Sequence, residues 1–343
     1  MRIALDATYS IDRYPSGVAI YSREILFGLA AQYPADQFLY CYRPKQFRYS
    51  TANSSSNVKR RLLLPSIPTF HAGLFHALNQ RVDRRPAKRV VTTFHDLFVL
   101  TAEYSSPEFR KRFTAQARRA VEQSDYIIAV SKFTAAQVRD LLGVEGARIR
   151  VIPHGVHVPQ QQGSPTREKM ILFVGALQVR KNIIRLVEAF ETLPEDWSLV
   201  LAGSARGYGA EQILDRIRAS ERRDRIRIAG YVSSHELEQL YSRASIFAFP
   251  SLDEGFGIPI LEAMAHSIPV LTSNRSALIE VADNAAITVD PYRTEEIASS
   301  LQKLVSDESL RDRLATQGRL RAARFTWQDS VRATYRIYQE LLS

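Results

Sequence analysis

The stretch IFAFPSLDEGFGIPILEAMAHSIPVLTS, residues 246–273, holds the pattern on which the fold assignment depends. A short apolar run, IFAFP, is followed by a glycine-bearing loop, a helix-like run that starts near Pro259, and a second apolar run, PVLTS. Proline is tolerated in the first turn of a helix, because its missing N–H would have no partner there. Two short buried strands joined through a helix predict a parallel β-α-β unit.

The same alternation runs along the whole chain. Strand-like runs occur at residues 2–8, 89–96, 126–131, 149–153, 170–176, 199–203, 226–231, 246–250 and 269–273. Helical periodicity lies between them, notably at 107–123 and in FTAAQVRDLLG, which ends at Gly143. Ser233 and Glu236 have the spacing of a capping box. This pattern is typical of an α/β protein with parallel sheets.

We expect two doubly wound, Rossmann-like domains, since 343 residues exceed the usual size of one core. The proline-rich, glutamine-rich run at 153–169 is the best linker candidate, which gives domains at 1–158 and 159–325. Residues 326–343 place Val331, Tyr335, Tyr338 and Leu342 on one helical face. We expect that helix to pack back on the N-terminal domain. Ligands should bind beyond the carboxyl ends of the strands, in a cleft between the domains.

Composition narrows the class of protein. With 45% hydrophobic and 24% charged residues, the chain has the balance of a soluble globular protein. No apolar run reaches the roughly 18 residues that span a bilayer, and the start MRIALDATYS does not resemble a signal peptide. The single cysteine, Cys41, cannot form an internal disulfide. We therefore expect a cytoplasmic protein.

The net charge of +10 calls for a partner or a solvated surface. Basic residues gather in the first half, at 59–61, 81–89 and 110–112. Solvated faces explain any single run, whereas all of them together also suit an anionic membrane surface or a phosphorylated substrate. No zinc-finger spacing or RNA-binding aromatic motif accompanies them, so we expect no nucleic-acid partner.

The loop EGFG offers an anion site. The backbone N–H groups of Phe256, Gly257 and Ile258 meet the positive end of the following helix dipole. Glu254 lies in the loop and Glu262 one helical turn in, so their side chains point to different partners. A diphosphate between two sugars would satisfy this arrangement, with one carboxylate for a ribose and the other for a hexose. A plain strand-to-helix turn with two surface glutamates, or an acid/base pair for hydrolysis, are the alternatives.

Three further features fall directly after strands. Arg180 and Lys181, in FVGALQVRKNI, place two cations at a helix start and favour a diphosphate clamp. Gly17, in Ser16-Gly17-Val18, opens a helix and offers a second backbone anion site, with a plain helix start as its rival. His95 closes the run RVVTTFHD, although a lone histidine is more often structural than catalytic.

The ordered set of these motifs resembles the retaining nucleotide-sugar glycosyltransferases of family four, which have the GT-B fold. The likeness is carried by EGFGIPILEAMA, with Glu254 and Glu262 in an E-x7-E spacing, and by MRIALDA, YPSGVAIYSREI, FHDL, VSKFTAAQV, VIPHGV, FVGALQVRKNI, LVLAG and FTW. It covers essentially the whole chain. Two departures stand out: Ser16-Gly17 replaces the paired glycines often found in the family, and His154 replaces a frequent asparagine, so we assign His154 no role.

The resemblance implies metal-independent transfer of a hexosyl unit from a nucleoside diphosphate sugar, without a further cofactor. It implies that Arg180 and Lys181 neutralise the leaving diphosphate, that Glu262 binds the ribose, and that Glu254 and His95 contact the donor hexose. The likeness is strongest to bacterial mannosyltransferases of surface-polysaccharide assembly. GDP-mannose is therefore the first donor to expect and UDP-glucose the second, with a glycan or lipid-linked saccharide at the inner membrane face as acceptor.

Other functions stay open at this level. A non-catalytic nucleotide-sugar or glycan binding protein would share the scaffold, and so would a GT-B epimerase or phosphorylase. The sequence contains no Asp-x-Asp pair and no G-x-G-x-x-G after its first strand, which disfavours a metal-bridged phosphate site and a nicotinamide enzyme. The loop GSARGYG, residues 203–209, is either part of the nucleotide site or a surface loop. Donor identity, acceptor linkage and oligomeric state are not encoded in recognisable motifs.

Overall fold

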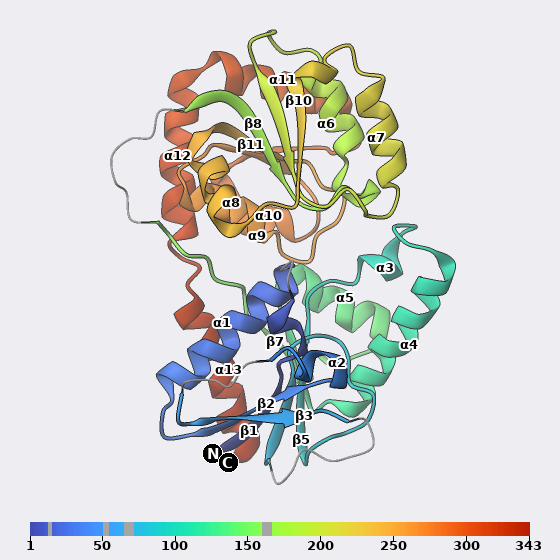
Figure 1. Cartoon of the computed structure of the whole chain (residues 1–343), viewed down its shortest axis with the longest axis vertical. Helices are drawn as coiled ribbons and strands as arrows, with labels where there is room; N and C mark the ends of the chain where they lie inside the picture. Colours follow the sequence, from blue (N-terminus) through green and yellow to red (C-terminus); the bar gives the residue numbers. More distant parts are fainter. Residues whose placement is uncertain (13–15, 51–54, 65–71, 160–166) are drawn as a thin grey trace. The chain divides into compact units, whose positions relative to one another are not determined.

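The computed structural model describes residues 1–12, 16–50, 55–64, 72–159 and 167–343. The chain divides into two compact units, one of Met1–Gly155 with Thr326–Ser343 and one of Val156–Phe325. Each unit is a parallel sheet flanked by helices (Figure 1). Part of the expected linker, residues 160–166, lies outside the described residues.

The first unit is built on a seven-stranded parallel sheet in the order β3-β2-β1-β4-β5-β6-β7. Its strands are β1 (Arg2–Asp6), β2 (Gln37–Tyr42), β3 (Val58–Leu62), β4 (Leu74–Ala77), β5 (Arg89–Phe94), β6 (Tyr126–Ala129) and β7 (Ile149–Val151). Its α-helices are α1 (Gly17–Gln32), α2 (Pro44–Phe47), α3 (Phe98–Thr101), α4 (Pro107–Gln123), α5 (Lys132–Leu142) and α13 (Trp327–Leu342).

Two hydrophobic clusters cover the two faces of this sheet. Because side chains alternate along a strand, Ile3 and Leu5 of β1 join one cluster while Ala4 joins the other. The first cluster includes residues of α1 and α13, and the second includes residues of α4 and α5. Val331 and Tyr338 of α13 are buried in the first cluster, so the apolar face of that helix packs on the sheet that begins with the first residues of the chain.

The second unit is a six-stranded parallel sheet in the order β10-β9-β8-β11-β12-β13. Its strands are β8 (Glu168–Val174), β9 (Ser198–Ala202), β10 (Ile226–Gly230), β11 (Ala244–Phe249), β12 (Val270–Ser273) and β13 (Ile287–Val289). Its α-helices are α6 (Ile183–Phe190), α7 (Ala210–Arg218), α8 (Ser234–Arg243), α9 (Ile258–Ala265), α10 (Ser276–Ala282), α11 (Thr294–Ser306) and α12 (Glu308–Ala322).

Local signals in the sequence explain several helix ends. Helix α4 has the predicted bounds, with the Ser106 side chain accepting a hydrogen bond from Phe109 N ahead of Pro107. Ser233 and Glu236 form both bonds of the predicted capping box. Gly143 ends α5 in the left-handed conformation, with φ 68°. None of the helices in the described parts of the chain is long and apolar enough to cross a lipid bilayer.

Both sheets reverse their strand order beside their first strand. The reversal lies between β1 and β4 in the first unit and between β8 and β11 in the second. Ligands of doubly wound sheets bind outside the carboxyl ends of the strands at such a reversal. The loops that follow these strands are therefore the places to look for a site.

Candidate functional site

Three predicted site residues meet at the strand reversal of the second unit. Arg180 and Lys181 lie in the short 3-10 turn η3 (Val179–Lys181) that follows β8, and Glu254 lies in the loop after β11. Because β8 and β11 are neighbours in the sheet, residues more than 70 positions apart come into contact.

Glu254 is held between the two cations. Arg180 NH1 lies 2.8 Å from Glu254 Oε2, and Lys181 Nζ lies 2.6 Å from Glu254 Oε1. Arg180 NH1 also donates to the carbonyl of Asp253 at 2.7 Å, and Lys181 Nζ stands 4.6 Å from the centre of the Phe249 ring. All three charged side chains are buried, with exposures of 8–9%. We call Arg180, Lys181 and Glu254 the ion triad; it carries a net charge of +1.

The ion triad fixes the charge state of its carboxylate. Burial alone would raise the pKa of Glu254, but Arg180 and Lys181 outweigh it and lower that pKa to about 2. Glu254 is therefore ionised at any physiological pH.

The loops around the ion triad are joined by backbone and side-chain hydrogen bonds. Leu252 N donates to Arg180 O at 2.8 Å, so the loop after β11 is joined to η3. Asn182 has φ 59°, and its side-chain amide donates to the carbonyls of Pro250 and Pro291. Glu254 N donates to Ser276 Oγ at 3.2 Å. The site is thus preorganised by three loops of one sheet edge.

The predicted backbone anion site lies at the start of α9. Gly257 caps this helix with φ 104°, a conformation that favours glycine, and a Cβ there would approach Leu278 Cδ2 to 2.6 Å. Phe256 and Ile258 are buried on either side of it. Helix α9 thus begins at Ile258, four residues after Glu254, and its first N–H groups lie at the positive end of the helix dipole.

Glu262 has different surroundings, as the sequence predicted. Its Oε2 accepts a hydrogen bond of 2.8 Å from the Tyr241 hydroxyl, and Tyr241 stacks on His266. Burial raises the pKa of Glu262, and the bond from Tyr241 opposes that rise. Tyr241, in α8, is a partner that the sequence motif did not reveal.

The loop at residues 203–209 is packed on the loop that follows β8. Leu177 N donates to Ser204 O, and Val179 N donates to Tyr208 O. A Cβ at Gly203 would come within 2.0 Å of Gly175 O, so the glycine permits a close backbone approach. The loop supports the segment that carries Arg180, while Tyr208 within it is exposed to solvent.

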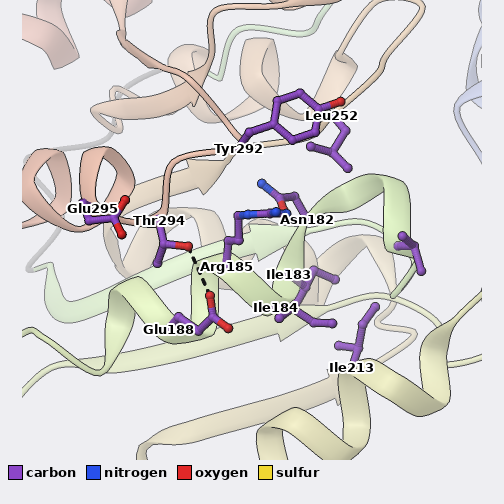
Figure 2. A pocket seen from close by; sticks show the side chains of 11 residues that line it. Asn182, Ile183, Ile184, Arg185, Glu188, Ile213, Leu252, Tyr292, Thr294 and Glu295 are labelled. Atoms are coloured by element: carbon purple, nitrogen blue, oxygen red, sulfur yellow. Dashed lines mark hydrogen bonds between the residues drawn. The ribbon is translucent and has the colours of Figure 1, made fainter. Parts of the chain in front are cut away.

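A cavity of about 390 Å³ adjoins the site without including it (Figure 2). It is lined by Val179, Asn182, Ile183, Ile184, Arg185, Glu188, Ile213, Leu252, Tyr292, Thr294 and Glu295. Figure 2 shows these side chains around the first turns of α6, with the Thr294 hydroxyl donating to Glu188. Since none of the lining residues is a predicted site residue, we do not assign the donor to this cavity.

In the first unit, His95 follows β5 and is buried. Its Nε2 donates to Leu78 O at 2.8 Å, and its ring contacts Tyr21 edge-on at 4.8 Å. His154 stacks on His95 with 5.4 Å between the ring centres. Sequence reasoning gave His154 no role, although its position in the motif VIPHGV was a usable signal. The hydrogen bond to Leu78 O places the proton of His95 on Nε2 and leaves Nδ1 as the acceptor atom.

A buried polar chain supports these rings. Tyr21 OH is 2.9 Å from Thr93 Oγ1, which is 2.8 Å from His76 Nε2, and His76 Nδ1 is 2.5 Å from Tyr338 OH. Burial lowers the pKa of His95 to about 4 and that of His76 to about 3, and it places the pKa of His154 well below its usual value. These histidines are neutral at neutral pH.

Gly17 begins α1 as predicted, but the neighbouring serine occupies part of the helix start. The Ser16 side chain accepts a hydrogen bond from Ala19 N at 3.4 Å. Residues 14–15, which complete the motif YPSGV, lie outside the described residues. No group of three or more His, Cys, Asp or Glu side chains that could hold a metal ion lies among the residues with described positions.

Comparison with known proteins agrees with the geometry. Two family models match the chain, "Glycosyltransferase Family 4" over residues 38–159 and "Glycosyl transferases group 1" over residues 157–321. Among curated proteins, the O-antigen chain mannosyltransferase B of Escherichia coli is 29% identical over 285 residues, which are 78% of this chain and 74% of that protein.

Two further similarities differ in extent. The serotype-specific mannosyltransferase WbdA of Escherichia coli is 28% identical over 71% of this chain, but this match spans only about a third, 32%, of that longer protein. The solved sucrose-phosphate synthase of Thermosynechococcus elongatus aligns over 99% of both chains with a TM-score of 0.82 and 22% identity, a likeness of fold. Because the two family models together match residues 38–321, the chain belongs to the group 1, family 4 glycosyltransferases, which have the GT-B fold.

Proposed function

We propose that the protein transfers a hexosyl unit, with retention, from a nucleoside diphosphate sugar to a hydroxyl of a glycan or lipid-linked saccharide. The observation that carries this proposal is the buried ion triad beside the first N–H groups of α9, at the strand reversal of the second sheet. Two cations and a helix N-terminus suit the diphosphate of such a donor.

In this proposal, the ion triad stabilises the charge that grows on the leaving diphosphate. Its net charge of +1 is set before the donor arrives, so little reorganisation is needed during the reaction. A bound diphosphate competes with Glu254 for Arg180 and Lys181. The Glu254 carboxylate then accepts hydrogen bonds from the donor hexose, and Glu262 accepts them from the ribose.

The reaction step conserves the configuration of the anomeric carbon. The bond between that carbon and the diphosphate oxygen breaks, and the acceptor oxygen bonds to the same face. The acceptor proton passes to an oxygen of the leaving phosphate. His95 remains neutral and contacts the hexose through Nδ1, because Nε2 is engaged by Leu78 O. This scheme assigns no step to a metal ion or a further cofactor.

The relatives support mannose, and GDP-mannose is therefore the first donor to test, with UDP-glucose second.

We also propose that the acceptor is reached at the inner membrane face, from the cytoplasm. Helix α4 supports this: Phe109 is 44% exposed, and Arg110, Lys111 and Arg112 follow it on the same first turns. Exposed aromatic and basic residues together suit an anionic lipid surface. Binding to phosphatidylglycerol vesicles should weaken as salt rises, and salt-independent binding or none would contradict this part.

The direct test follows radiolabelled sugar from GDP-mannose or UDP-glucose into a saccharide acceptor. Appearance of labelled saccharide with release of the nucleoside diphosphate supports the proposal. A binding-only protein would release no label, an epimerase would alter the sugar without an acceptor, and a phosphorylase would need phosphate and no nucleotide. A thermal-shift screen across nucleotides identifies the donor, because a ligand at 100 times its dissociation constant stabilises by about 2.7 kcal/mol.

A further inference from the structure

A second group of charged side chains lies at the strand reversal of the first sheet. Asp6 ends β1 and is 1% exposed. Its Oδ1 accepts hydrogen bonds from the backbone and hydroxyl of Thr8, at 3.1 and 2.5 Å. Its Oδ2 is buried, accepts no hydrogen bond from any described residue, and lies 3.9 Å from Arg43 NH2. A buried carboxylate is thus satisfied on one oxygen only.

From Asp6 the charges continue outward in a row. Arg43, directly after β2, donates through NH1 to Asp83 Oδ2 at 2.9 Å, and Arg81 Nε lies 3.8 Å from that same oxygen. Side-chain exposure increases along the row, from 1% at Asp6 to 14% at Arg43, 30% at Asp83 and 40% at Arg81. We call these four residues the paired-charge row; it has a buried end and a solvent-facing end.

The paired-charge row is electrically balanced. Two carboxyl groups face two guanidinium groups, so the net charge is zero when both carboxyl groups are ionised. Burial raises the pKa of Asp6, and Arg43 opposes that rise. The neighbouring loop repeats this balance, because Arg23 donates to the carbonyls of Ser10 and Asp12 and lies near the Asp12 carboxylate. A phosphate placed here would meet Asp83 as well as the arginines. Uncharged hydroxyls suit it better, since a carboxylate accepts from a hydroxyl and a guanidinium donates to one.

The loop that carries Asp83 has further unused polar atoms. Asn79 Oδ1 and Gln80 Oε1 are buried and have no hydrogen-bond partner among the described residues. Buried polar atoms are rarely left without a hydrogen-bond partner, so we expect each of these two oxygens to bind a water or a ligand. The same loop contributes Leu78 O to His95. The loop after β4 therefore joins the paired-charge row to the histidine that the proposed reaction uses.

We propose that Arg43, Asp83 and Arg81 recognise the hydroxyl groups of an uncharged saccharide acceptor, and that Asp6 is a positioning residue that holds the Arg43 guanidinium from below. This inference rests on the proposed transferase function and adds to it the chemical class of the acceptor. It assigns specificity to Arg43, Arg81 and Asp83, which lie outside the motifs that carry the family resemblance, and it predicts a neutral sugar rather than a sugar phosphate.

The test uses the full chain and the variant Asp83→Asn, whose substitution lies at the exposed end of the row and keeps the side-chain shape. Transfer from GDP-mannose to a neutral α-mannobiose is measured together with hydrolysis of the donor by water. We expect the KM for mannobiose to rise at least about tenfold, with the donor KM and the hydrolysis rate unchanged. Asp140→Asn, an exposed partner of Arg139 in α5, is the matched control and should behave as wild type.

The positioning role has its own readout. Asp6→Asn should raise the KM for mannobiose while GDP affinity and the circular dichroism spectrum stay unchanged. A merely structural defect would weaken GDP binding and alter the spectrum. If Asp6→Asn does not fold, Asp83→Asn alone carries the test. An unchanged KM in Asp83→Asn, or a preference of the wild type for mannose 6-phosphate over methyl α-mannoside, would overturn the inference.

Failure of the proposed function is recognised separately. If the wild type turns over neither donor, binding of methyl α-mannoside is followed by saturation-transfer NMR. If the wild type binds methyl α-mannoside and Asp83→Asn does not, the recognition site is supported even though the transferase function is not. Absence of saturation transfer from the wild type to methyl α-mannoside would refute the recognition site itself.

Discussion

The two sheets have the same order of strands around the reversal, but the side chains at the carboxyl ends of those strands differ in charge. In the second unit, two cations surround one buried carboxylate, and the N-terminus of α9 follows. In the first unit, the paired-charge row contains two carboxyl groups and two guanidinium groups, and the buried histidines are neutral. We therefore propose that the shared topology provides a ligand edge in each unit, and that the residues after the strands select an anion at one edge and a neutral polyol at the other.

Replacing the carboxylate of the ion triad should have the largest effect. In Glu254→Gln we expect kcat to fall about 10³-fold, because the donor hexose loses a negatively charged hydrogen-bond acceptor in the transition state. GDP should bind at least as tightly as to the wild type, since the net charge of the cluster rises from +1 to +2. Steady-state transfer assays and calorimetry with GDP measure the two effects. Glu168→Gln, at an exposed pair with Arg243, is the control; full turnover by Glu254→Gln would refute its role.

Removing one cation tests the anion side of the comparison. Arg180→Ala should weaken GDP binding about 10- to 100-fold, because a charge-assisted contact is lost and the cluster becomes neutral. Arg218→Ala, which removes an exposed arginine in α7, should leave GDP affinity unchanged. If both variants bound GDP equally, the ion triad would not be the diphosphate site.

The two units should lose stability at different pH values. The pKa of His76 and of His95 is lowered in the folded state, so their unfolded forms bind protons first as pH falls below about 6.5. Each of these two histidines lowers the free energy of unfolding of the first unit by up to about 1.4 kcal/mol per pH unit as the pH falls below about 6.5. The pKa of Glu254 is lowered to about 2, so its contribution is present above about 4.5 and is lost only below that pH.

Hydrogen exchange at β5 and at β11, measured at pH 7, 6 and 5 and corrected for intrinsic rates, checks this difference. Protection in β5 should fall over this range, and protection in β11 should hold. Equal losses in both strands would mean that the buried histidines do not control the acid stability of the first unit.

Metal removal should have the smallest effect. Because Arg180 and Lys181 supply the positive charge at the diphosphate, EDTA should leave the transfer rate within about twofold of its value with added Mg²⁺. Initial rates in the two buffers give the answer, and a loss of activity that Mg²⁺ restores would contradict the assignment.

The fold class could be predicted because the alternation of short apolar strand-like runs with helix-like runs is visible in a single sequence. Three strands of the first unit were missed for separate reasons. Strand β3 is an edge strand of sequence VKRRL, so its charges resembled a solvated run. Strand β4 has only four residues. Strand β2, QFLYCY, carried an apolar signal that could have identified it.

The site could be predicted as residues but not as contacts. Arg180 and Glu254 each follow a strand, which the sequence shows, but their pairing depends on β8 lying beside β11. The same limit hid the paired-charge row, because Asp6 ends β1, Arg43 follows β2 and Asp83 lies in the loop after β4. His154 was set aside as a departure from a motif, whereas in the structure it stacks on His95.

The most direct measurement titrates wild type, Arg180→Ala and Asp83→Asn separately with GDP and with α-mannobiose. The account predicts that Arg180→Ala loses affinity for GDP and keeps its affinity for the saccharide, and that Asp83→Asn shows the reverse. Arg180→Ala with wild-type affinity for GDP, or either substitution weakening both ligands alike, would contradict the division of labour between the two sheet edges.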